Sequence, residues 1–455
     1  MHIHPLPLAD TVDALQKGEV SLKKLINEVC DRIEAHEPQL QALLPEPERR
    51  RRLLQEADVL AQNHSEFKQR PALYGVLLGV KDIIHADGFS TRAGTCLPAH
   101  LFQGPEAGLV TRLRQAGALI LGKTVTTEFA HLTPALTTNP WNPEHTPGGS
   151  SSGSAAAVAA GFCQLALGTQ TIGSVIRPAA FCGLVGFKPS FGRVPLDGVI
   201  PCSVSVDHIG LFTQDAKGMA MAAAVICPNW RPAMNPMNPT NPTNPAAWPV
   251  LGVPDGPYLE QAETEALKAF EKQISAFQAA GCKVVRIKMF TDIEKINRQH
   301  KDLVAFEMAR VHAAWYPAYA HLYQPMTREV IEKGRTIDSE AADQARQGRS
   351  DLRKAVEQIR QAQGIDLWVA PAATGPAPQG LSSTGNPIMN LPWTYMGLPV
   401  LCLPTGRAWN GLPLGIQWAA GSGQDEFLLH WGMKIESILG KGPRDQGVEG
   451  SRVKK

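Results

Sequence analysis

Serine and glycine residues are concentrated between positions 147 and 185, where the sequence reads PGGSSSGSAAAVAAGFCQLALGTQTIGSVIRPAAFCGLV. A serine hydroxyl is a nucleophile when a neighbouring base removes its proton. Small residues permit close backbone approaches, which let N–H groups converge on a developing oxyanion. Gly/Ser stretches also occur as linkers, but a linker is not normally followed at once by an alanine-rich helix and a buried strand. The segment is therefore a candidate centre for nucleophilic catalysis.

Lys81 lies upstream in the apolar run LYGVLLGVKDII and is a candidate base. A lysine acts as a base only when it is neutral, and its unperturbed pKa is about 10.4. Burial among apolar groups lowers that pKa. Taken alone, the run favours a simpler interpretation, in which Lys81 forms a salt bridge at a strand end with Asp82 as its partner. The catalytic interpretation needs support from elsewhere in the chain.

Two short serine motifs indicate other enzyme families. Residues 149–153 satisfy GxSxG, the nucleophile elbow of α/β-hydrolases, with Ser151 as nucleophile. That elbow must follow a strand, whereas the prolines of the preceding TTNPWNPEHTP exclude one. Ser21 and Lys24 satisfy SxxK, a pattern of penicillin-binding proteins, but they fall in an amphipathic helix and no KTG accompanies them. Neither motif has the context that it requires.

The elements around these residues alternate between helix and strand. Helices are expected in SLKKLINEVCDRIEAH, behind an N-cap at Ser21, and in PEPERRRRLLQEADVLAQN. Short apolar runs predict strands at 73–84 and in GALILGKT, QLALG and FCGLVGFKP. This alternation predicts an α/β fold, with a mixed twisted β-sheet core flanked by α-helices.

The later sequence favours one large domain. Residues 231–249 repeat Asn-Pro and predict a loop, because proline continues neither a helix nor an interior strand. Residues 257–362 are helix-rich, after which DLWVAP predicts a strand and LPVLCLPTG with LPLGIQWAA predicts a hairpin. We therefore expect one domain over 71–440, with 1–70 as a helical segment packed on it. The polar tail 441–455 is expected to be flexible.

Composition excludes several classes of protein. The formal net charge is +2, from 44 basic and 42 acidic residues, which provides no basic field for nucleic acid or anionic membranes. The arginine run 49–52 is expected to be a solvated helix face. No apolar run reaches the roughly 18–20 residues of a membrane helix, and the start lacks a secretory pattern. Eight scattered cysteines without metal-type spacing predict reduced thiols and a cytoplasmic location.

Three separated motifs resemble the amidase signature family: GVLLGVKDII, then GGSSSGSAAAVAAG with GTQTIGSVIRPAAFCG, then GLPVLCLPTG with GLPLGIQWAA. The resemblance covers most of the chain, and the motifs stand in the expected order. It implies a hydrolase that cleaves the C–N bond of a small-molecule amide, carbamate or ureide, and that needs no metal or cofactor. Homodimers are common among such relatives.

The resemblance assigns a catalytic triad residue by residue. Ser174 matches the nucleophile, Ser150 matches the bridging serine whose peptide bond is cis in the family, and Lys81 matches the base. Ser154 matches the serine that helps to hold the lysine. The resemblance thus reverses the preference for a salt-bridged Lys81, and it implies an acyl-enzyme on Ser174.

The same resemblance assigns the surrounding groups. Backbone N–H groups around Thr171, Ile172 and Gly173 are expected to hold the oxyanion. Ile172 departs from the glycine common at its position; isoleucine does not adopt positive φ cheaply, and its bulk is expected to narrow the acyl pocket. Arg177 is expected to brace the loop electrostatically rather than to contact substrate.

Two further side chains are candidate substrate contacts, with core packing as the alternative. His131 lies near the signature in EFAHLTP, and Trp393 lies in a late segment that borders the pocket in the family. Two alternative functions stay open. One is a non-catalytic binding protein with the amidase fold, which Ile172 favours; the other is the glutaminase-like subunit of a tRNA-dependent amidotransferase.

Overall fold

One ten-stranded mixed β-sheet runs through the computed structural model, which describes residues 1–231 and 248–439. The predicted loop 231–249 therefore lies mostly outside the described residues, and the predicted tail 441–455 lies wholly outside them. The order of strands across the sheet is β2-β1-β3-β5-β4-β9-β10-β8-β6-β7. Their bounds are β1 Leu77–Lys81, β2 Leu119–Thr124, β3 Leu165–Gln170, β4 Val185–Lys188, β5 His208–Thr213, β6 Leu251–Asp255, β7 Val284–Lys288, β8 Leu367–Pro371, β9 Val400–Arg407 and β10 Pro413–Ala419.

Parallel and antiparallel pairs are combined in this sheet. β1 pairs in parallel with β2 and β3, and β6 pairs in parallel with β7 and β8. The pairs between β3, β5, β4, β9, β10 and β8 are antiparallel. Strands β1 to β5 and β8 are buried along their whole length, which explains their nearly continuous apolar sequences. The predicted α/β fold with a mixed sheet is confirmed.

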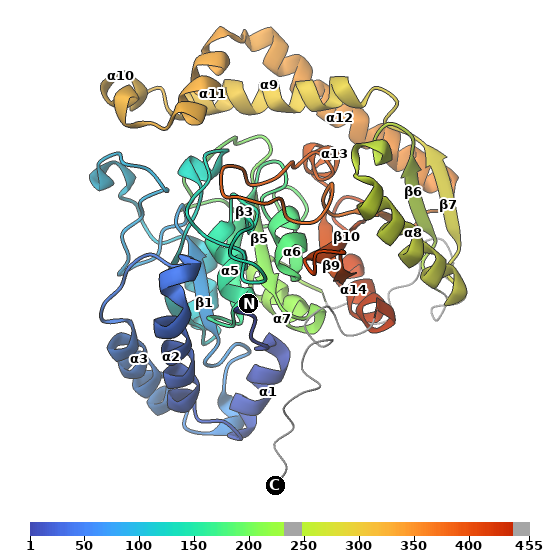
Figure 1. The fold of residues 1–455 in the computed structure, drawn as a ribbon. Coiled ribbons are helices and arrows are strands. Elements are labelled where there is room, and N and C mark those ends of the chain that lie inside the picture. Colours follow the sequence, from blue (N-terminus) through green and yellow to red (C-terminus); the bar gives the residue numbers. More distant parts are fainter. Residues whose placement is uncertain (232–247, 440–455) are drawn as a thin grey trace.

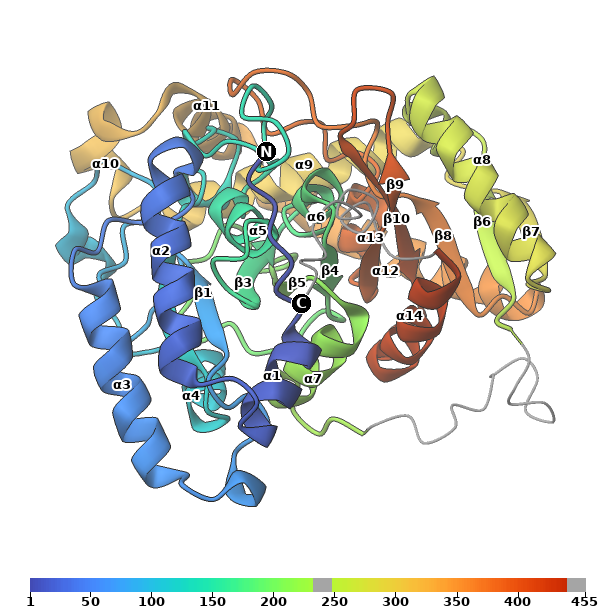
Figure 2. The same ribbon diagram turned by 60° about the horizontal axis from the view of Figure 1, so that its bottom comes forward.

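Helices cover both faces of the sheet (Figures 1 and 2). Successive residues of a strand point to opposite faces. On β9, Cys402 lies on the side of α6 (Ile176–Cys182), and Leu401 packs against Gly432 of α14 (Asp425–Leu439). α5 (Ser152–Ala159) packs beside α6, and α7 (Ala216–Ile226) packs beside α14. The two helices of the Gly/Ser-rich segment therefore lie together.

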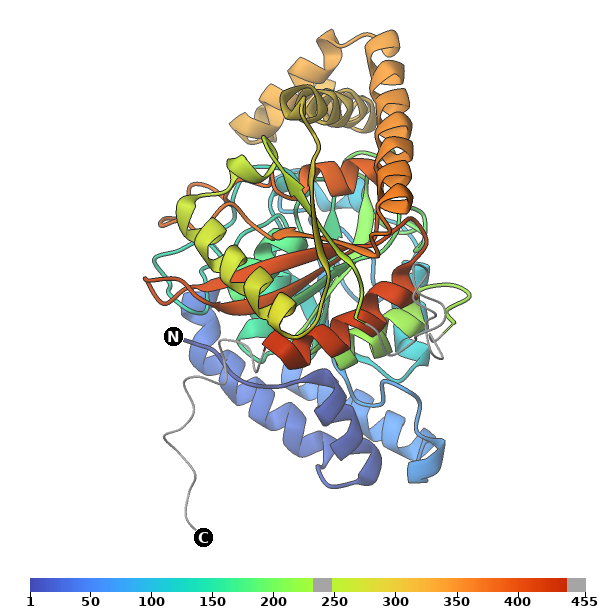
Figure 3. The same ribbon diagram turned by 90° about the vertical axis from the view of Figure 1, so that its right-hand side faces the viewer.

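A layer of three long helices and one short helix lies across one end of the sheet, at the top of Figures 1 and 3. It consists of α9 Ile293–Val311, α10 Tyr316–Tyr319, α11 Pro325–Thr336 and α12 Ser339–Ala362. The predicted helix-rich character of 257–362 holds for this layer and for α8 (Thr264–Ala279). It is wrong for β7, which pairs with β6 at the sheet edge. That strand is short and half-exposed, so the sequence VVRIK carries no long apolar run.

The N-terminal region is helical, as predicted. The remaining helices are α1 Leu8–Lys17, α2 Leu22–Leu40, α3 Arg49–Asn63, α4 Gly108–Gln115 and α13 Leu391–Met396, with short 3-10 turns η1 Phe67–Gln69, η2 Ala99–Phe102, η3 Glu128–Ala130, η4 Leu259–Gln261 and η5 Ala320–Leu322. Among all helices of the described ranges, none combines the length and apolar character that crossing a bilayer requires.

The arginine run of α3 is only partly the solvated face that its charge suggested, because Arg51 is exposed whereas Arg49 and Arg52 turn toward the sheet. Arg49 donates to the carbonyl of Leu121 at 3.2 Å, and Arg52 donates to the carbonyl of Ile120 at 2.9 Å. Both carbonyls belong to β2, the edge strand against which α3 packs. An edge strand presents unpaired backbone groups, and these two guanidinium groups satisfy some of them. The run therefore helps to fasten the N-terminal helices to the sheet.

Candidate active site

The parallel direction of β1 and β3 places Lys81 and the segment of Ser174 at the same end of these two strands. β1 and β3 are parallel neighbours, with Val80 aligned to Leu167, so their carboxyl ends point the same way. Lys81 is the last residue of β1, and Ser174 follows shortly after the end of β3. Each strand is enclosed by neighbours on both sides, which is why Lys81 emerges from an apolar run.

Lys81 is fully buried and makes three short side-chain contacts. Its Nζ lies 2.8 Å from Ser150 Oγ, 3.0 Å from Ser151 Oγ and 2.9 Å from Thr169 Oγ1. Burial lowers the pKa of this amine to about 7, while the more distant charge of Asp207 opposes the shift. The neutral amine, which the catalytic interpretation requires, is therefore well populated near neutral pH.

Asp82 does not pair with Lys81. Its carboxylate lies 3.3 Å from Nζ of Lys123 and accepts the N–H of Arg92 at 3.1 Å. Asp82 begins the turn that follows β1, and these contacts hold its carboxylate away from Lys81. The salt-bridge interpretation of Lys81 is therefore wrong.

Ser150 belongs to a loop in which glycine and a cis peptide bond bring the hydroxyl to Lys81. The bond between Gly149 and Ser150 is cis, as the resemblance implied. A Cβ on Gly149 would lie 2.7 Å from Thr384 Cγ2, so only glycine fits there. No strand leads directly into this loop, and the hydroxyl of Ser151 accepts a hydrogen bond from Lys81. The context of an α/β-hydrolase elbow is thus absent in the structure as well.

Ser174 lies between β3 and α6, in a loop fixed by buried polar side chains. Thr171 donates its hydroxyl to Asp207 at 2.6 Å. Gln170 accepts the N–H groups of Val175 and Ile176 at 2.8 and 2.9 Å. Ser174 itself is 8% exposed, and its hydroxyl makes no hydrogen bond within the described residues. The relay from Ser150 to Ser174 therefore remains a prediction.

The backbone of this loop leaves donors free. In the described ranges, no hydrogen bond uses the N–H groups of Ile172, Gly173 or Ser174. Ile172 does not have positive φ, so the strain that a β-branched residue would suffer there is absent. Gly173 is required by space, since a Cβ there would lie 2.4 Å from Asn390 Oδ1. Adjacent free N–H groups beside a serine are the arrangement that an oxyanion hole requires.

Arg177 links the two serine loops, which agrees with the expected bracing role. Its guanidinium donates to the carbonyl of Gly149 at 2.5 Å and to the carbonyl of Gly385 at 2.8 Å. Its own N–H bonds to the carbonyl of Gly173 at 3.0 Å. Burial lowers the pKa of Arg177 to about 9. The side chain thus ties the Ser150 loop to the segment at Thr384 and Gly385, while the backbone N–H holds the residue that precedes Ser174.

Ser154 does not hold the lysine. Its hydroxyl bonds to Thr124 Oγ1 at 2.7 Å and to the carbonyl of Leu167 at 2.8 Å. The neighbours of Lys81 are instead Ser151 and Thr169, as described above. Ser154 lies one helical turn further along α5, so it fastens that helix to β2 and β3.

Trp393 is a core residue rather than a substrate contact. It is 1% exposed, and its indole N–H donates to Tyr258 Oη at 2.7 Å. Its ring packs edge-on against Tyr258 and Phe290, with centroids 5.9 and 5.6 Å away. The prediction that Trp393 binds substrate is therefore wrong, and core packing explains the residue.

His131 stays a candidate substrate contact. Its Nδ1 is buried without a hydrogen-bond partner, and burial lowers the pKa of the ring to about 4. The preceding Phe129 packs against His312 and Tyr323, with ring centroids 4.4 and 5.4 Å away. His131 therefore adjoins an aromatic cluster that joins the η3 turn to the α9–α11 layer.

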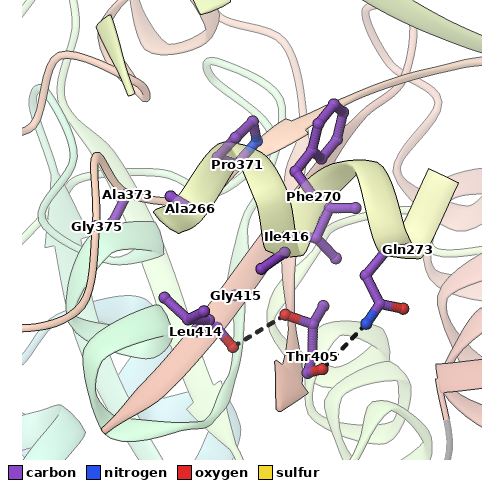
Figure 4. Close-up of a pocket in the computed structure, with 11 residues that line it drawn as sticks. Ala266, Phe270, Gln273, Pro371, Ala373, Gly375, Thr405, Leu414, Gly415 and Ile416 are labelled. Carbon is purple, nitrogen blue, oxygen red and sulfur yellow. Dashed lines mark hydrogen bonds between the residues drawn. The ribbon is translucent and has the colours of Figure 1, made fainter. Parts of the chain in front are cut away.

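A separate small pocket lies far along the sheet, between α8 and strands β8 to β10 (Figure 4). Its volume is about 10 Å³, the lower limit for a single water molecule. Gln273 donates to the carbonyl of Thr405, and Thr405 donates to the carbonyl of Leu414. No titratable side chain lines it that could activate the Thr405 hydroxyl, so it is not a candidate active site. Within the described residues, no group of three or more potential ligands could hold a metal ion.

Comparison with known proteins agrees with this geometry. The model of the Amidase family matches residues 24–429. AmiD of Mycobacterium tuberculosis, a putative amidase, is 29% identical, over 96% of this chain and 95% of that protein. One subunit of the glutamyl-tRNA(Gln) amidotransferase of a Synechococcus species is also 29% identical, over 95% and 96% respectively. A crystal structure of an amidase superposes with a TM-score of 0.83 at 30% identity, over 96% of this chain and all of the other. The chain belongs to the amidase family and is an amide-cleaving hydrolase.

Proposed function

We propose that the protein hydrolyses an amide-type C–N bond through a covalent acyl-enzyme on Ser174. Lys81 is the base, and Ser150 carries the proton between Lys81 and Ser174. The N–H groups of Ile172, Gly173 and Ser174 receive the oxyanion. The product is a carboxylic, carbamic or ureido acid together with ammonia or an amine.

The proposed steps conserve protons and bonds. Ser174 Oγ bonds to the carbonyl carbon while its proton passes to Ser150 Oγ and the proton of Ser150 passes to Lys81 Nζ. The C–N bond then breaks, and the leaving nitrogen takes a proton back through Ser150. A water molecule next attacks the ester, and its proton follows the same route. Release of the acid returns Ser174 to its starting state.

The observation that carries this proposal is the environment of Lys81. The amine is buried, its pKa is lowered to about 7, and it lies 2.8 Å from Ser150 Oγ. Within the described residues it forms no ion pair with a carboxylate. All three of its hydrogen-bond partners are hydroxyl groups, which carry protons that a neutral amine can accept, as backbone carbonyl groups do not. A neutral amine facing hydroxyl groups is instead suited to general-base chemistry.

Within this proposal the acyl group is small. Ile172 stands where a glycine is common, is partly buried and packs against the core, so it takes space beside the oxyanion site. We expect kcat/KM to fall as the acyl chain of a series of simple primary amides is lengthened. A preference for long chains would contradict this substrate class and leave the acyl-enzyme itself untouched.

The amidotransferase relative supports a second candidate function. The similarity to that amidotransferase protein covers nearly the whole chain, at the same identity as the similarity to AmiD. Under this alternative the protein would release ammonia from glutamine only within a complex. Measurement of ammonia from glutamine and from simple amides by the purified chain distinguishes the two. Turnover of simple amides by the isolated chain favours the independent amidase.

The proposal is tested by labelling the intact protein with a fluorophosphonate probe and mapping the modified peptide. We expect the label on Ser174, its loss in Ser174→Ala and its slowing in Lys81→Ala. A label on Ser151 would contradict the assignment of the nucleophile. Absence of label on folded wild-type protein would favour a non-catalytic binding protein.

A further inference from the structure

Two side chains outside the Gly/Ser-rich segment form hydrogen bonds with carbonyl groups of the loop that precedes Ser174. His300 on α9 approaches the carbonyl of Thr171, with Nε2 at 3.0 Å from the oxygen. Thr394 on α13 donates its hydroxyl to the carbonyl of Ile172 at 2.6 Å. Both side chains are fully buried. Neither contact belongs to a helix or strand ladder, so each fixes one peptide unit of an irregular loop.

The planarity of the peptide bond converts these contacts into directions for N–H groups. In a trans peptide, the carbonyl of one residue and the N–H of the next point in opposite directions. The cis bond at Gly149–Ser150 does not involve this loop, and its peptide units are trans. Drawing the carbonyl of Thr171 toward α9 therefore turns the N–H of Ile172 away from α9. Drawing the carbonyl of Ile172 toward α13 likewise turns the N–H of Gly173 away from α13.

The protonation state of His300 suits it to this role. A carbonyl oxygen only accepts, so the ring must carry its proton on Nε2. Burial lowers the pKa of His300 to about 3, which keeps the ring neutral, and its Nδ1 is buried without a partner. The ring therefore donates one hydrogen bond, to Thr171. Nothing else in the described residues uses its polar atoms.

The hydroxyl of Thr394 is itself held in place by a hydrogen bond from Gln170. Its Oγ1 accepts the side-chain N–H of Gln170 at 2.8 Å, which leaves its single proton for an acceptor. The carbonyl of Ile172 at 2.6 Å is closer than that of Asn390 at 3.1 Å. Gln170 in turn accepts the N–H groups of Val175 and Ile176. The loop is thus clamped at both ends, while the N–H groups between remain unused.

We propose that His300 and Thr394 are positioning residues for the oxyanion site, which aim the N–H groups of Ile172 and Gly173 at the substrate oxygen by holding the opposite side of the same peptide units. This inference rests on the proposed function, because it assumes that these N–H groups act in the reaction. It assigns a catalytic consequence to α9 and α13, neither of which carries a reacting group. It also explains how the loop tolerates Ile172, since orientation is imposed by the carbonyl partners rather than by glycine flexibility.

The test compares Thr394→Val with Thr394→Ser. Valine keeps the shape and removes the hydroxyl, whereas serine keeps the hydroxyl. We expect Thr394→Val to lower kcat by about 10- to 100-fold with KM changed less than about threefold, because removing one oxyanion donor outright costs about 10²–10³. Thr394→Ser should stay within about threefold of wild type. Equal loss in both variants, or a loss confined to KM, would overturn the inference.

A second pair on another element keeps the test decisive if Thr394→Val fails to fold. His300→Leu removes the donor, whereas His300→Gln places an N–H near the position of Nε2. We expect leucine to lower kcat and glutamine to restore part of it. Equal kcat values for His300→Leu and wild type would overturn the role of His300.

Crystal structures of Thr394→Val and His300→Leu separate this inference from the proposed function. The inference predicts that the 172–173 peptide unit turns in the first variant and that the 171–172 unit turns in the second. Unmoved peptide units would contradict it even where activity falls. Conversely, turnover that survives Ser174→Ala would refute the proposed acyl-enzyme, whatever the peptide units do.

Discussion

The protonation state of Lys81 leads to a prediction about the pH dependence of kcat/KM. The pKa of the buried amine is lowered to about 7, and only its neutral form can accept the proton of Ser150. Because protonation removes the base, kcat/KM should fall about tenfold per pH unit below this pKa and level off above it. A pH–rate profile of the wild-type protein measures the inflection. A flat profile between pH 5 and 9 would contradict the assignment of Lys81 as the base.

Lys188 provides a matched control for that profile. It is a second fully buried lysine with its pKa lowered to about 7 by burial, and it donates to the carbonyl groups of Pro189 and Leu398. Its position at the end of β4 gives it no role in the proposed chemistry. Lys188→Met should keep the inflection of the wild-type profile. Lys81→Met should instead lower kcat/KM by about 10²–10⁴ above pH 7 and abolish the inflection.

Arg177 makes a prediction that joins stability to activity. Replacement by methionine would leave the buried carbonyl of Gly149 and the partly buried carbonyl of Gly385 without this donor. Each buried acceptor that loses its partner costs about 1–3 kcal/mol. We therefore expect Arg177→Met to lower the midpoint of urea unfolding and to slow labelling of Ser174. Unchanged labelling in a destabilised protein would show that the loop does not need this brace.

At the scale of single residues, the sequence predicted which residues form the site better than it predicted their contacts. Lys81, Ser150 and Ser174 follow from motif order, and the structure places Lys81 against Ser150. The other neighbours of Lys81, Ser151 and Thr169, were missed, because motif matching does not show which way a strand or helix residue turns. Thr169 is the second-last residue of β3, so alternation along β3 was the signal that could have found it.

At the scale of elements, the Glu307 side chain of α9 fastens this helix to the segment before β5 and to α12. Glu307 is 2% exposed and accepts hydrogen bonds from Ser203, Ser205 and Arg346 at 2.7, 2.9 and 2.7 Å. Removing the carboxylate leaves several donors unpaired, so Glu307→Ala should destabilise the fold by about 3 kcal/mol. Hydrogen exchange should rise first in α9 and α12.

An exposed ion pair on the same helix gives the comparison. Asp302 pairs with Lys333 at 2.6 Å, with both side chains partly exposed to solvent. Exposed pairs contribute at most about 1 kcal/mol. Asp302→Ala should therefore change unfolding little, and hydrogen exchange of α9 should stay as in wild type. Equal effects of the two substitutions would show that Glu307 does not hold the layer.

The long apolar and helical elements could be predicted, and the short ones could not. β1, β3, α3 and the β9–β10 hairpin lie where their periodicity indicated. β7 has only five residues and a half-exposed pattern, so neighbouring helices dominated the sequence signal. The arginine run of α3 was misjudged because the partners of its guanidinium groups are backbone carbonyls of β2, which no side-chain pattern reveals.

For the whole molecule, a sheet continuous from β2 to β7 predicts one cooperative unfolding transition. Two probes at separate places test this. All nine tryptophans lie between Trp141 and Trp431, whereas Cys30 is buried in α2 near the other end of the chain. Tryptophan fluorescence and thiol accessibility of Cys30 should change at the same urea concentration. Earlier exposure of Cys30 would show that the N-terminal helices unfold as a separate unit.

The native thiols supply the baseline of that experiment. Within the described residues, no disulfide joins any of the eight cysteines, and Cys96 is the exposed one. A thiol reagent should therefore modify one cysteine rapidly in the folded protein and the other seven only on unfolding. The variant Cys96→Ser should abolish the rapid phase.

Trapping the acyl-enzyme tests the central claim most directly. The protein is mixed with an activated amide substrate, quenched in acid during turnover, digested and examined by mass spectrometry. The account predicts the acyl mass on the peptide that contains Ser174, and its accumulation should be lost in Ser174→Ala. Turnover without any acylated peptide, or an acyl group on Ser151, would contradict the account.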